Sequence, residues 1–300
     1  MRNQFQGVCP VVNVPFDCSG AIDWQSFSDV IEYTLAQGVH TLALFAFNSE
    51  PHKMTFEEKM KLIPFFTSTV KNRVETLIGL VDNSISGCIE LGQTAVRANC
   101  DGVILFPPSI STPDLNGLLN YFKTIAKEVK LPVMLQDNPR STGVSMSVEL
   151  LYRAHREIEN FDYLKVECPI PARKIRQLSE LSQGSLKCYS GNGGIYAVEA
   201  FLSGAWGIMP GVCTAGVYVK LLRYLENGET NKARDVFERV LPLVWYEDQS
   251  LEFYIACEKA LLERASAIAF DHPRQPGYRL DEKEKDELFT LYDRCVGISN

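Results

Sequence analysis

The sequence lacks the long apolar runs of membrane proteins and the basic runs of nucleic-acid-binding proteins. It has no apolar run approaching the ~18 residues of a membrane span, and Met1-Arg2-Asn3-Gln4-Phe5 lacks the apolar segment of a signal peptide. Basic runs are equally scarce: none is longer than Arg173–Lys174, and the net charge is −7 at pH 7. Nucleic-acid binders normally carry a basic stripe. We therefore expect a cytoplasmic protein with no nucleic-acid or membrane partner.

Metal and cofactor signatures are missing as well. The nine cysteines contain no C-x-x-C pair, and the four histidines have no His or Glu partner at metal-ligand spacing. Gly-x-Ser-x-Gly and P-loop patterns are absent. Several cysteines fall within or beside apolar runs, where a free thiol behaves as a small hydrophobe, and this suits a reducing compartment. We expect neither a metal nor an organic cofactor.

The 300 residues do contain a regular alternation of strand-like and helix-like segments. Most of the strand-like runs are four to seven residues long and apolar on both faces, which is typical of buried parallel strands. This pattern predicts an α/β fold, a (β/α)8 TIM barrel, over residues 1–225. An open doubly wound sheet is the alternative, but Pro10–Gly20 lacks its phosphate-binding fingerprint. The predicted strands are Val8–Val14, Thr41–Phe47, Thr76–Val81, Gly102–Phe106, Pro132–Gln136, Tyr163–Val166, Leu186–Tyr189 and Gly207–Met209.

The last quarter of the chain has a different pattern. Beyond Gly211 the strand signal stops and only segments with helical spacing follow. No linker or low-complexity stretch separates them from the barrel. We expect residues 226–300 to form a helical extension packed on the barrel. The predicted helices are Val217–Asn227, Asn231–Tyr246, Leu251–Ile268 and Asp281–Cys295.

One lysine stands out within a predicted strand. Strand alternation puts Tyr163, Lys165 and Glu167 on one face and the apolar Leu164 and Val166 on the other. If the apolar face packs under the helices, Lys165 points into the barrel, where desolvation would lower its pKa and leave an amine able to attack a carbonyl. The alternative is a lysine of the barrel interior that merely pairs with Glu167.

Six segments follow one another along the chain in a recognisable order. They are Val14-Pro15-Phe16, Ala46-Phe47-Asn48-Ser49-Glu50, Leu131–Leu135, Tyr163-Leu164-Lys165, Ser190-Gly191-Asn192 and Gly207-Ile208-Met209. Together they resemble the dihydrodipicolinate synthase/N-acetylneuraminate lyase family of class I Schiff-base lyases. The resemblance implies that Lys165 forms an imine with a small-molecule 2-oxo acid. It also implies a homo-oligomer, a tetramer or a dimer, since family members are commonly tetramers.

Departures from the family pattern bear on the reaction. The positions of the family's three proton-relay residues hold Gln136, Ser109 and Phe47, so the resemblance argues against dihydrodipicolinate synthesis itself. The arginine that holds a dicarboxylic substrate falls on Ser141, with Arg140 one place away. The acidic residues with which the sialic acid lyase holds its polyol fall on a Gly-Gly pair, which argues against that substrate too.

The missing relay also distinguishes between two kinds of lyase. Retro-aldol cleavage needs a base at the C4 hydroxyl, and Gln136 is a neutral amide that cannot serve as one. Dehydration of the same imine needs removal of a C3 proton and protonation of the departing hydroxyl, for which Glu167 is the nearest acid/base. The segments around Phe47, Gln136 and Lys165 resemble the family's sugar-acid dehydratases, such as 2-keto-3-deoxyarabonate dehydratase.

Substrate-binding candidates follow from position at the strand ends. Asn48 and Ser49 would bind the 2-oxo acid carboxylate, or else form a capping turn before the next helix. Asn192 could bind a distal hydroxyl of the substrate, and Met209 would offer a backbone carbonyl. Ser109 is the fifth substrate-binding candidate. We therefore expect a Schiff-base dehydratase for a 2-oxo-3-deoxy sugar acid. The alternatives are a pyruvate-dependent aldolase that uses water as its base, and a catalytically degenerate barrel that acts as a binding protein.

Overall fold

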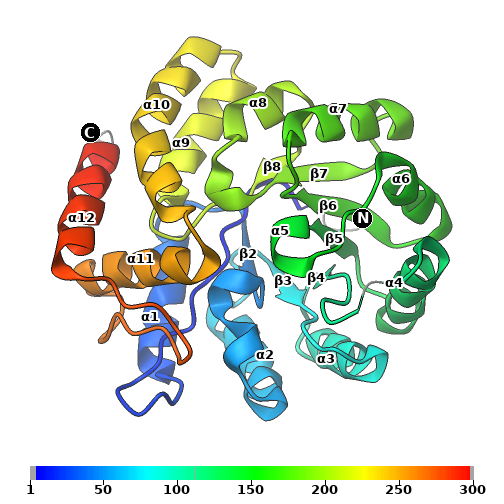
Figure 1. Cartoon of the computed structure of the whole chain (residues 1–300), viewed down its shortest axis with the longest axis horizontal. Coiled ribbons are helices and arrows are strands. Elements are labelled where there is room, and N and C mark those ends of the chain that lie inside the picture. The colour runs from blue at the N-terminus through cyan, green and yellow to red at the C-terminus, as the bar shows by residue number, and fades with distance from the viewer. Residues whose placement is uncertain (1–4, 112, 298–300) are drawn as a thin grey trace.

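The computed structural model describes residues 5–111 and 113–297; Met1–Gln4, considered above for a signal sequence, lie outside the described residues. Eight parallel strands form a nearly closed barrel surrounded by helices (Figure 1). They pair in the order β1-β8-β7-β6-β5-β4-β3-β2, and a parallel bridge between Val11 and Ala43 joins the segment after β1 to β2. The predicted (β/α)8 barrel is confirmed. The strands are β1 Gly7–Val8, β2 Thr41–Leu44, β3 Glu75–Gly79, β4 Gly102–Leu105, β5 Val133–Asp137, β6 Phe161–Val166, β7 Lys187–Ser190 and β8 Gly207–Ile208.

Each predicted strand overlaps an observed one, but β1 is much shorter than Val8–Val14. Pro10 and Pro15 have no N–H to donate, so the pairing cannot continue as a regular ladder. The chain beyond β1 is held instead by single bonds, such as the one from Val12 N to Ala43 O at 2.9 Å.

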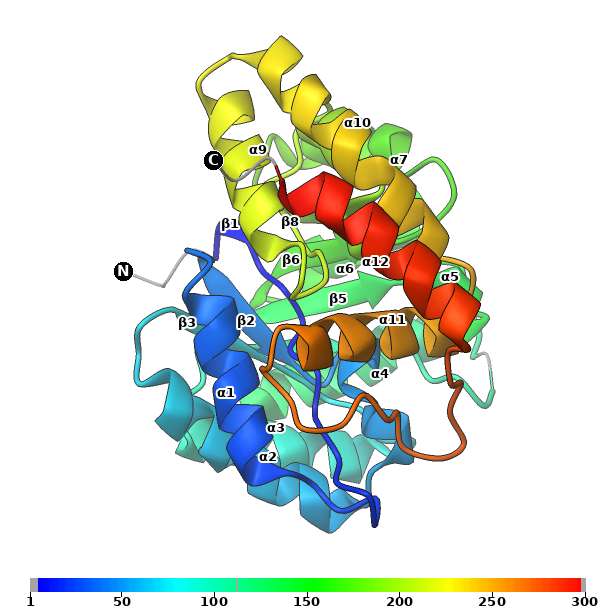
Figure 2. The same ribbon diagram turned by 90° about the vertical axis from the view of Figure 1, so that its left-hand side faces the viewer.

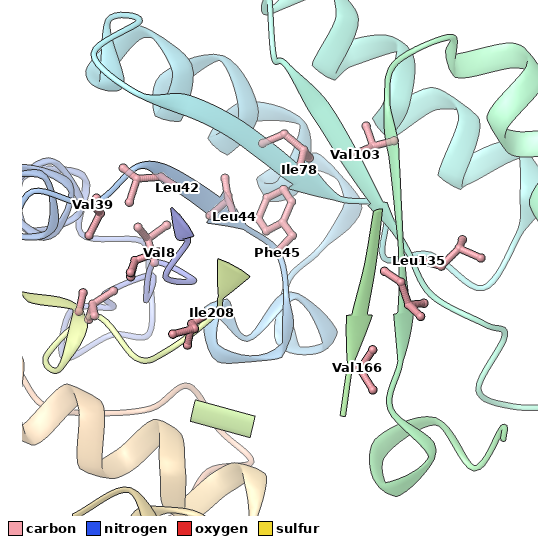
Figure 3. Packing of buried hydrophobic residues seen from close by; sticks show 14 of the residues in the cluster. Val8, Val39, Leu42, Leu44, Phe45, Ile78, Val103, Leu135, Val166 and Ile208 are labelled. Atoms are coloured by element: carbon pink, nitrogen blue, oxygen red, sulfur yellow. The ribbon is translucent and has the colours of Figure 1, made fainter. Parts of the chain in front are cut away.

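The strands separate two apolar cores. Side chains that point outward, such as Leu135 and Val166, pack beneath the helices in the larger one (Figure 3). Side chains that point inward, such as Met134 and Tyr163, form a smaller cluster inside the barrel. Strands such as β5 and β6 are therefore apolar on both faces, which explains the continuous apolar runs of the sequence.

Helices alternate with the strands, and capping side chains fix where several begin. The Thr55 hydroxyl accepts a bond from Glu58 N at 3.2 Å, while the Glu58 carboxylate accepts one from Thr55 N at 2.8 Å. The helices are α1 Trp24–Leu35, α2 Phe56–Val70, α3 Ile85–Arg97, α4 Leu115–Val129, α5 Pro139–Thr142, α6 Val148–Glu157, α7 Pro171–Ser182, α8 Ala197–Leu202 and α9 Ala215–Glu226. Short 3-10 turns follow β2 and β7: η1 Phe47–Ser49, η2 Pro51–Lys53 and η3 Asn192–Gly194.

Three further helices lie together on one side of the barrel (Figures 1 and 2). They are α10 Thr230–Glu247, α11 Leu251–Arg264 and α12 Glu282–Val296. α10 packs on α9 and α12, while α11 contacts η1 at the end of β2. The predicted helix Leu251–Ile268 ends four residues early, because Ser266 adopts a left-handed conformation with φ 58° that a helix cannot contain. The extension thereby reaches the end of the barrel where the strands finish.

Within residues 5–111 and 113–297, no helix is both long and apolar enough to cross a membrane. The same residues contain no group of three or more His, Cys, Asp or Glu side chains arranged to hold a metal ion. All nine cysteines are free, and every one except Cys18 is buried. Burial raises the pKa of the Cys188 thiol to about 12, so this residue is an unreactive part of the core.

Candidate active site

A cavity of about 430 Å³ lies at the carboxyl-terminal ends of the strands. Its wall combines residues that end or follow β2, β5, β6, β7 and β8 with residues 248–251 and Tyr254 of the α10–α11 segment. The chemistry of TIM barrels lies at this end. Five of the eight residues predicted from the sequence line it: Asn48, Lys165, Glu167, Asn192 and Met209. The other three, Gln136, Ser49 and Ser109, lie elsewhere and are described below.

Lys165 lies near the end of β6 with its side chain inside the barrel. Its neighbours Leu164 and Val166 pack in the outer core, as strand alternation predicts. The Lys165 side chain is 7% exposed, and its Nζ lies 3.1 Å from Glu167 Oε1. The ion pair offered above as the alternative explanation of this lysine therefore exists. The same amine also lines the cavity, so the pair is accessible to a substrate.

The Glu167 carboxylate is the centre of a buried polar network. Oε2 accepts hydrogen bonds from Gln136 Nε2 at 2.8 Å and Asn138 Nδ2 at 2.9 Å. Oε1 accepts one from the Asn192 backbone N–H at 2.8 Å and faces the Lys165 amine. All four partners are donors, so the surroundings are complementary to a carboxylate anion. These contacts hold the Glu167 carboxylate in one orientation beside the Lys165 amine.

Gly191 makes the space that Glu167 occupies. A Cβ added at Gly191 would lie 2.3 Å from Glu167 Cγ and 2.4 Å from its Oε1, closer than real atoms approach. We expect Gly191→Ala to displace the carboxylate. If Glu167 is the acid/base predicted from the sequence, the variant slows proton exchange at C3 of pyruvate by about 100-fold, since a shift of ~1 Å in a catalytic group costs that much. Exchange in D2O, followed by NMR, measures it.

The matched control is Gly216→Ala in α9, where an added Cβ would lie 3.4 Å from the nearest side-chain atom, an ordinary contact. This variant should exchange pyruvate protons at the wild-type rate. Equal rates in the Gly191 and Gly216 variants would mean that the glycine does not control the position of Glu167.

Gln136, predicted as a catalytic residue, is fully buried and does not face the cavity. Its amide nitrogen donates to Glu167, while its Oε1 has no hydrogen-bond partner among the described residues. Gln136 and Lys165 are register partners in the neighbouring strands β5 and β6, so they lie side by side. Gln136 therefore contacts Glu167 and does not line the cavity.

The turn after β2 presents Asn48 to the cavity but not Ser49. The Ser49 hydroxyl donates to Val12 O at 2.6 Å and accepts from Phe45 N at 3.0 Å, so it holds the turn in place. Ser49 is fully buried, and the direct substrate contact predicted for it has no support from this position. Ser109 is exposed in the loop after β4, outside the cavity wall.

The glycine-rich turn after β7 owes its composition to packing. Asn192 and Met209 line the cavity as predicted. Gly193 has a φ of 62°, and a Cβ added at Gly194 would lie 2.5 Å from the Tyr218 ring. Side chains at these positions would push the turn away from the helices behind it. In this chain the packing of the turn against Tyr218 therefore favours glycine at these positions.

Several cavity residues escaped the sequence analysis, three of them with ionisable side chains. Arg140 was noted only as lying one place from a family position, and Asp248 and Tyr254 come from the carboxyl-terminal helices. The one available signal was the polar break at residues 248–250 between two helical runs. Burial raises the pKa of Asp248, an effect that Arg140 partly offsets. Burial and the nearby Glu258 raise the pKa of Tyr254 well above 10, so its hydroxyl stays protonated.

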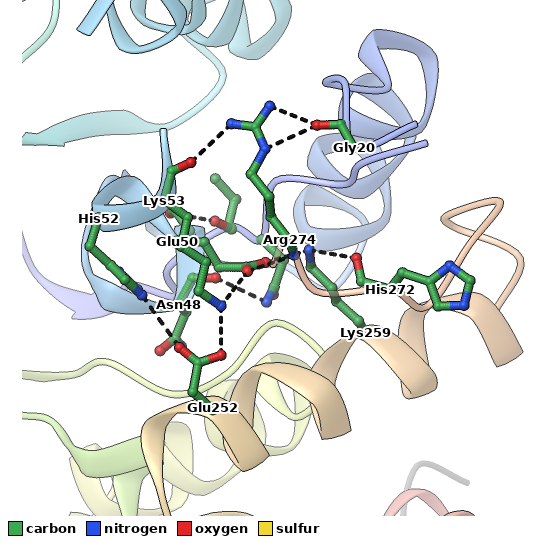
Figure 4. Close-up of polar contacts among 12 residues, drawn as sticks. Gly20, Asn48, Glu50, His52, Lys53, Glu252, Lys259, His272 and Arg274 are labelled. Carbon is green, nitrogen blue, oxygen red and sulfur yellow. Dashed lines mark hydrogen bonds and ion pairs between the residues drawn. The ribbon is translucent and has the colours of Figure 1, made fainter. Parts of the chain in front are cut away.

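A buried charge cluster connects the carboxyl-terminal helices to the turn that carries Asn48 (Figure 4). Glu50, directly after η1, is fully buried and forms ion pairs with Lys259 of α11 and with Lys53, the latter at 2.9 Å. Its Oε2 also accepts from Arg274 N at 3.0 Å. Burial lowers the pKa of Lys259 to about 8, against the attraction of Glu50. The carboxyl-terminal extension thus fixes one wall of the cavity.

The fold and the cavity together define a class: a (β/α)8 barrel protein whose site is built on a buried lysine–carboxylate pair at the strand ends. The chain belongs to the dihydrodipicolinate synthetase family, whose family model matches residues 4–293. It is a lyase of this family.

Two curated relatives and one solved structure illustrate the similarity. 4-Hydroxy-tetrahydrodipicolinate synthase of Bacillus subtilis (strain 168) is 27% identical over 241 residues, covering 80% of this chain and 83% of that protein. L-2-Keto-3-deoxyarabonate dehydratase of Azospirillum brasilense is 26% identical over 294 residues, covering 96% and 94%. The crystal structure of dihydrodipicolinate synthase from Rhodopseudomonas palustris superposes with a TM-score of 0.91 at 23% identity, covering 96% of this chain and 97% of that one. The superposition supports the fold.

Proposed function

We propose that this protein is a Schiff-base-forming lyase that dehydrates a 2-oxo-3-deoxy sugar acid. The observation that carries the proposal is the Lys165–Glu167 pair: an amine on the cavity wall with a carboxylate at 3.1 Å that is oriented by three further donors. An amine with an adjacent proton acceptor has the parts needed to form an imine with a ketone. A barrel kept only for binding has little reason to bury both charges.

The proposed reaction releases one water overall. The Lys165 amine attacks the C2 carbonyl, and loss of water gives the imine. Glu167 removes a proton from C3, and the electron pair expels the C4 hydroxyl, which leaves as water with a proton returned by the same carboxyl. Hydrolysis of the imine consumes one water and restores the lysine. The product is a 2-oxo acid lighter than the substrate by one water.

The buried amide of Gln136 favours dehydration over aldol cleavage. Cleavage requires a base for the C4 hydroxyl, and the position that would supply it holds an amide that is buried and bonded to Glu167. The relative from Azospirillum brasilense, which covers nearly the whole chain, is named as a dehydratase. We extend this activity class to the present protein.

Borohydride trapping tests the proposal. The protein is incubated with pyruvate and then with a panel of five- and six-carbon 2-oxo-3-deoxy acids, reduced, digested and analysed by mass spectrometry. A reduced adduct on Lys165 is expected, and unreduced reactions should yield the dehydrated 2-oxo acid. No adduct with any 2-oxo acid would overturn the enzyme proposal in favour of a binding protein. Free pyruvate plus an aldehyde would replace the dehydratase by an aldolase.

We further propose that the protein is a homo-oligomer. Ser109 and Ile110 form an exposed tip of the loop after β4, and the Ile110 side chain is 80% exposed. One exposed isoleucine does not by itself mark an interface, so the proposal is based on the family to which the chain belongs.

A further inference from the structure

The far wall of the cavity carries a second ion pair, formed by Arg140 of α5 and Asp248 between α10 and α11. Arg140 Nη1 lies 3.0 Å from both carboxylate oxygens of Asp248. Its Nη2 donates to the backbone carbonyls of Asp248 at 2.9 Å and Gln249 at 3.0 Å. Both terminal nitrogens of the guanidinium are therefore already bonded within the chain.

The Arg140–Asp248 ion pair determines which charges this wall of the cavity presents to a ligand. Among the described residues that line the cavity, the two cations, Lys165 and Arg140, each have a carboxylate partner. When Lys165 is bonded to C2 of the substrate, the Arg140 guanidinium is the cation left for the distal end among the described cavity residues, and Asp248 pairs with it. Asp248 itself keeps acceptor capacity, because each of its oxygens receives one bond and a carboxylate has about four acceptor sites. The neighbouring Gln249 and Ser250 on the same wall are uncharged.

We propose that the Arg140–Asp248 pair selects substrates whose distal end is uncharged and carries a hydroxyl, and rejects those that end in a carboxylate or a phosphate. The proposal rests on the proposed function, since it concerns the far end of a substrate whose C2 is held at Lys165. A distal hydroxyl donates to the spare acceptor positions of Asp248. A distal anion is acceptor-only and meets the Asp248 charge with no unpaired cation to offset it.

Two probes of equal length isolate this effect: 5-hydroxy-2-oxopentanoate, which ends in a hydroxyl, and 2-oxoglutarate, which ends in a carboxylate. Half-saturating concentrations are measured by borohydride trapping on Lys165. The wild-type protein should favour the hydroxyl probe at least tenfold. Asp248→Asn, which frees the Arg140 charge, should move the ratio at least tenfold toward 2-oxoglutarate. Arg140→Met, which leaves Asp248 unpaired, should move it the opposite way. Structural damage alone would not shift the ratio in opposite directions.

Asp293→Asn is the matched control. Asp293 of α12 pairs with Arg264 at 3.0 Å outside the cavity wall, and its substitution changes the charge by the same amount as Asp248→Asn. The probe ratio should stay at the wild-type value in this variant. Equal wild-type binding of the two probes, or an unchanged ratio in Asp248→Asn, would overturn the selection proposal.

Pyruvate separates this failure from failure of the proposed function. It has three carbons and no distal group, so its trapping reports Lys165 chemistry alone. Pyruvate adducts in all variants with equal binding of the two longer probes would refute the selection by Arg140 and Asp248 and leave the lyase intact. Absence of an adduct on Lys165 with pyruvate and with both longer probes in the wild-type protein would refute both proposals.

Discussion

Replacing Lys165 with alanine is expected to abolish the borohydride adduct and to reduce turnover by about 10⁴-fold or more, as loss of a nucleophile commonly does. The physical reason is that no other side chain on the cavity wall described here offers an amine. The variant also leaves the Glu167 carboxylate buried without its cation, and such a loss destabilises the fold by several kcal/mol. Mass spectrometry of the reduced protein and a thermal melt measure the two effects separately.

Lys165→Arg separates chemistry from charge. Its guanidinium preserves a cation beside Glu167 but stays protonated and cannot form an imine. This variant should melt close to the wild-type temperature and still show no adduct. Lys61→Ala, which removes an exposed lysine of α2, should be trapped like the wild-type protein. An adduct that persists in Lys165→Arg would place the imine on another lysine and exclude the proposed site.

The barrel could be predicted from patterns among residues that are close together in the sequence. The strands follow from runs of apolar residues, and the inward direction of Lys165 follows from alternation within four residues of β6. Both depend on neighbours in sequence, so they are visible without knowledge of the fold. The short β1 is the exception, since its prolines interrupt the ladder inside an otherwise suitable apolar run.

The far side of the cavity could not be predicted in the same way. Arg140 and Asp248 are 108 residues apart, and their pairing depends on where α10 and α11 lie against the barrel. Ser49 illustrates the same limit: its position in the turn predicts a substrate contact, while its hydroxyl is hydrogen-bonded to two backbone groups. Which polar side chains remain available is decided by long-range packing, which a linear pattern does not contain.

Replacing Glu167 with glutamine is expected to slow proton exchange at C3 of pyruvate by about 10²–10⁴-fold, the usual contribution of a general base. The amide cannot accept a proton at neutral pH. It also brings an NH2 group into a site where Gln136, Asn138 and the Asn192 N–H all donate, so one contact becomes repulsive. Exchange in D2O measures the proton transfer, and borohydride trapping measures imine formation in the same sample.

The two readouts distinguish a base from a support for the lysine. If Glu167 acts at C3, exchange is lost while an adduct still accumulates on Lys165. Unchanged exchange would remove Glu167 from the proton transfer. Loss of both signals would assign it to activating Lys165 rather than to the elimination. Gln136→Met removes one of the donors to Glu167 without removing the carboxylate. Its smaller loss of exchange, with the adduct retained, would identify the carboxylate as the reacting group and the amide as its support.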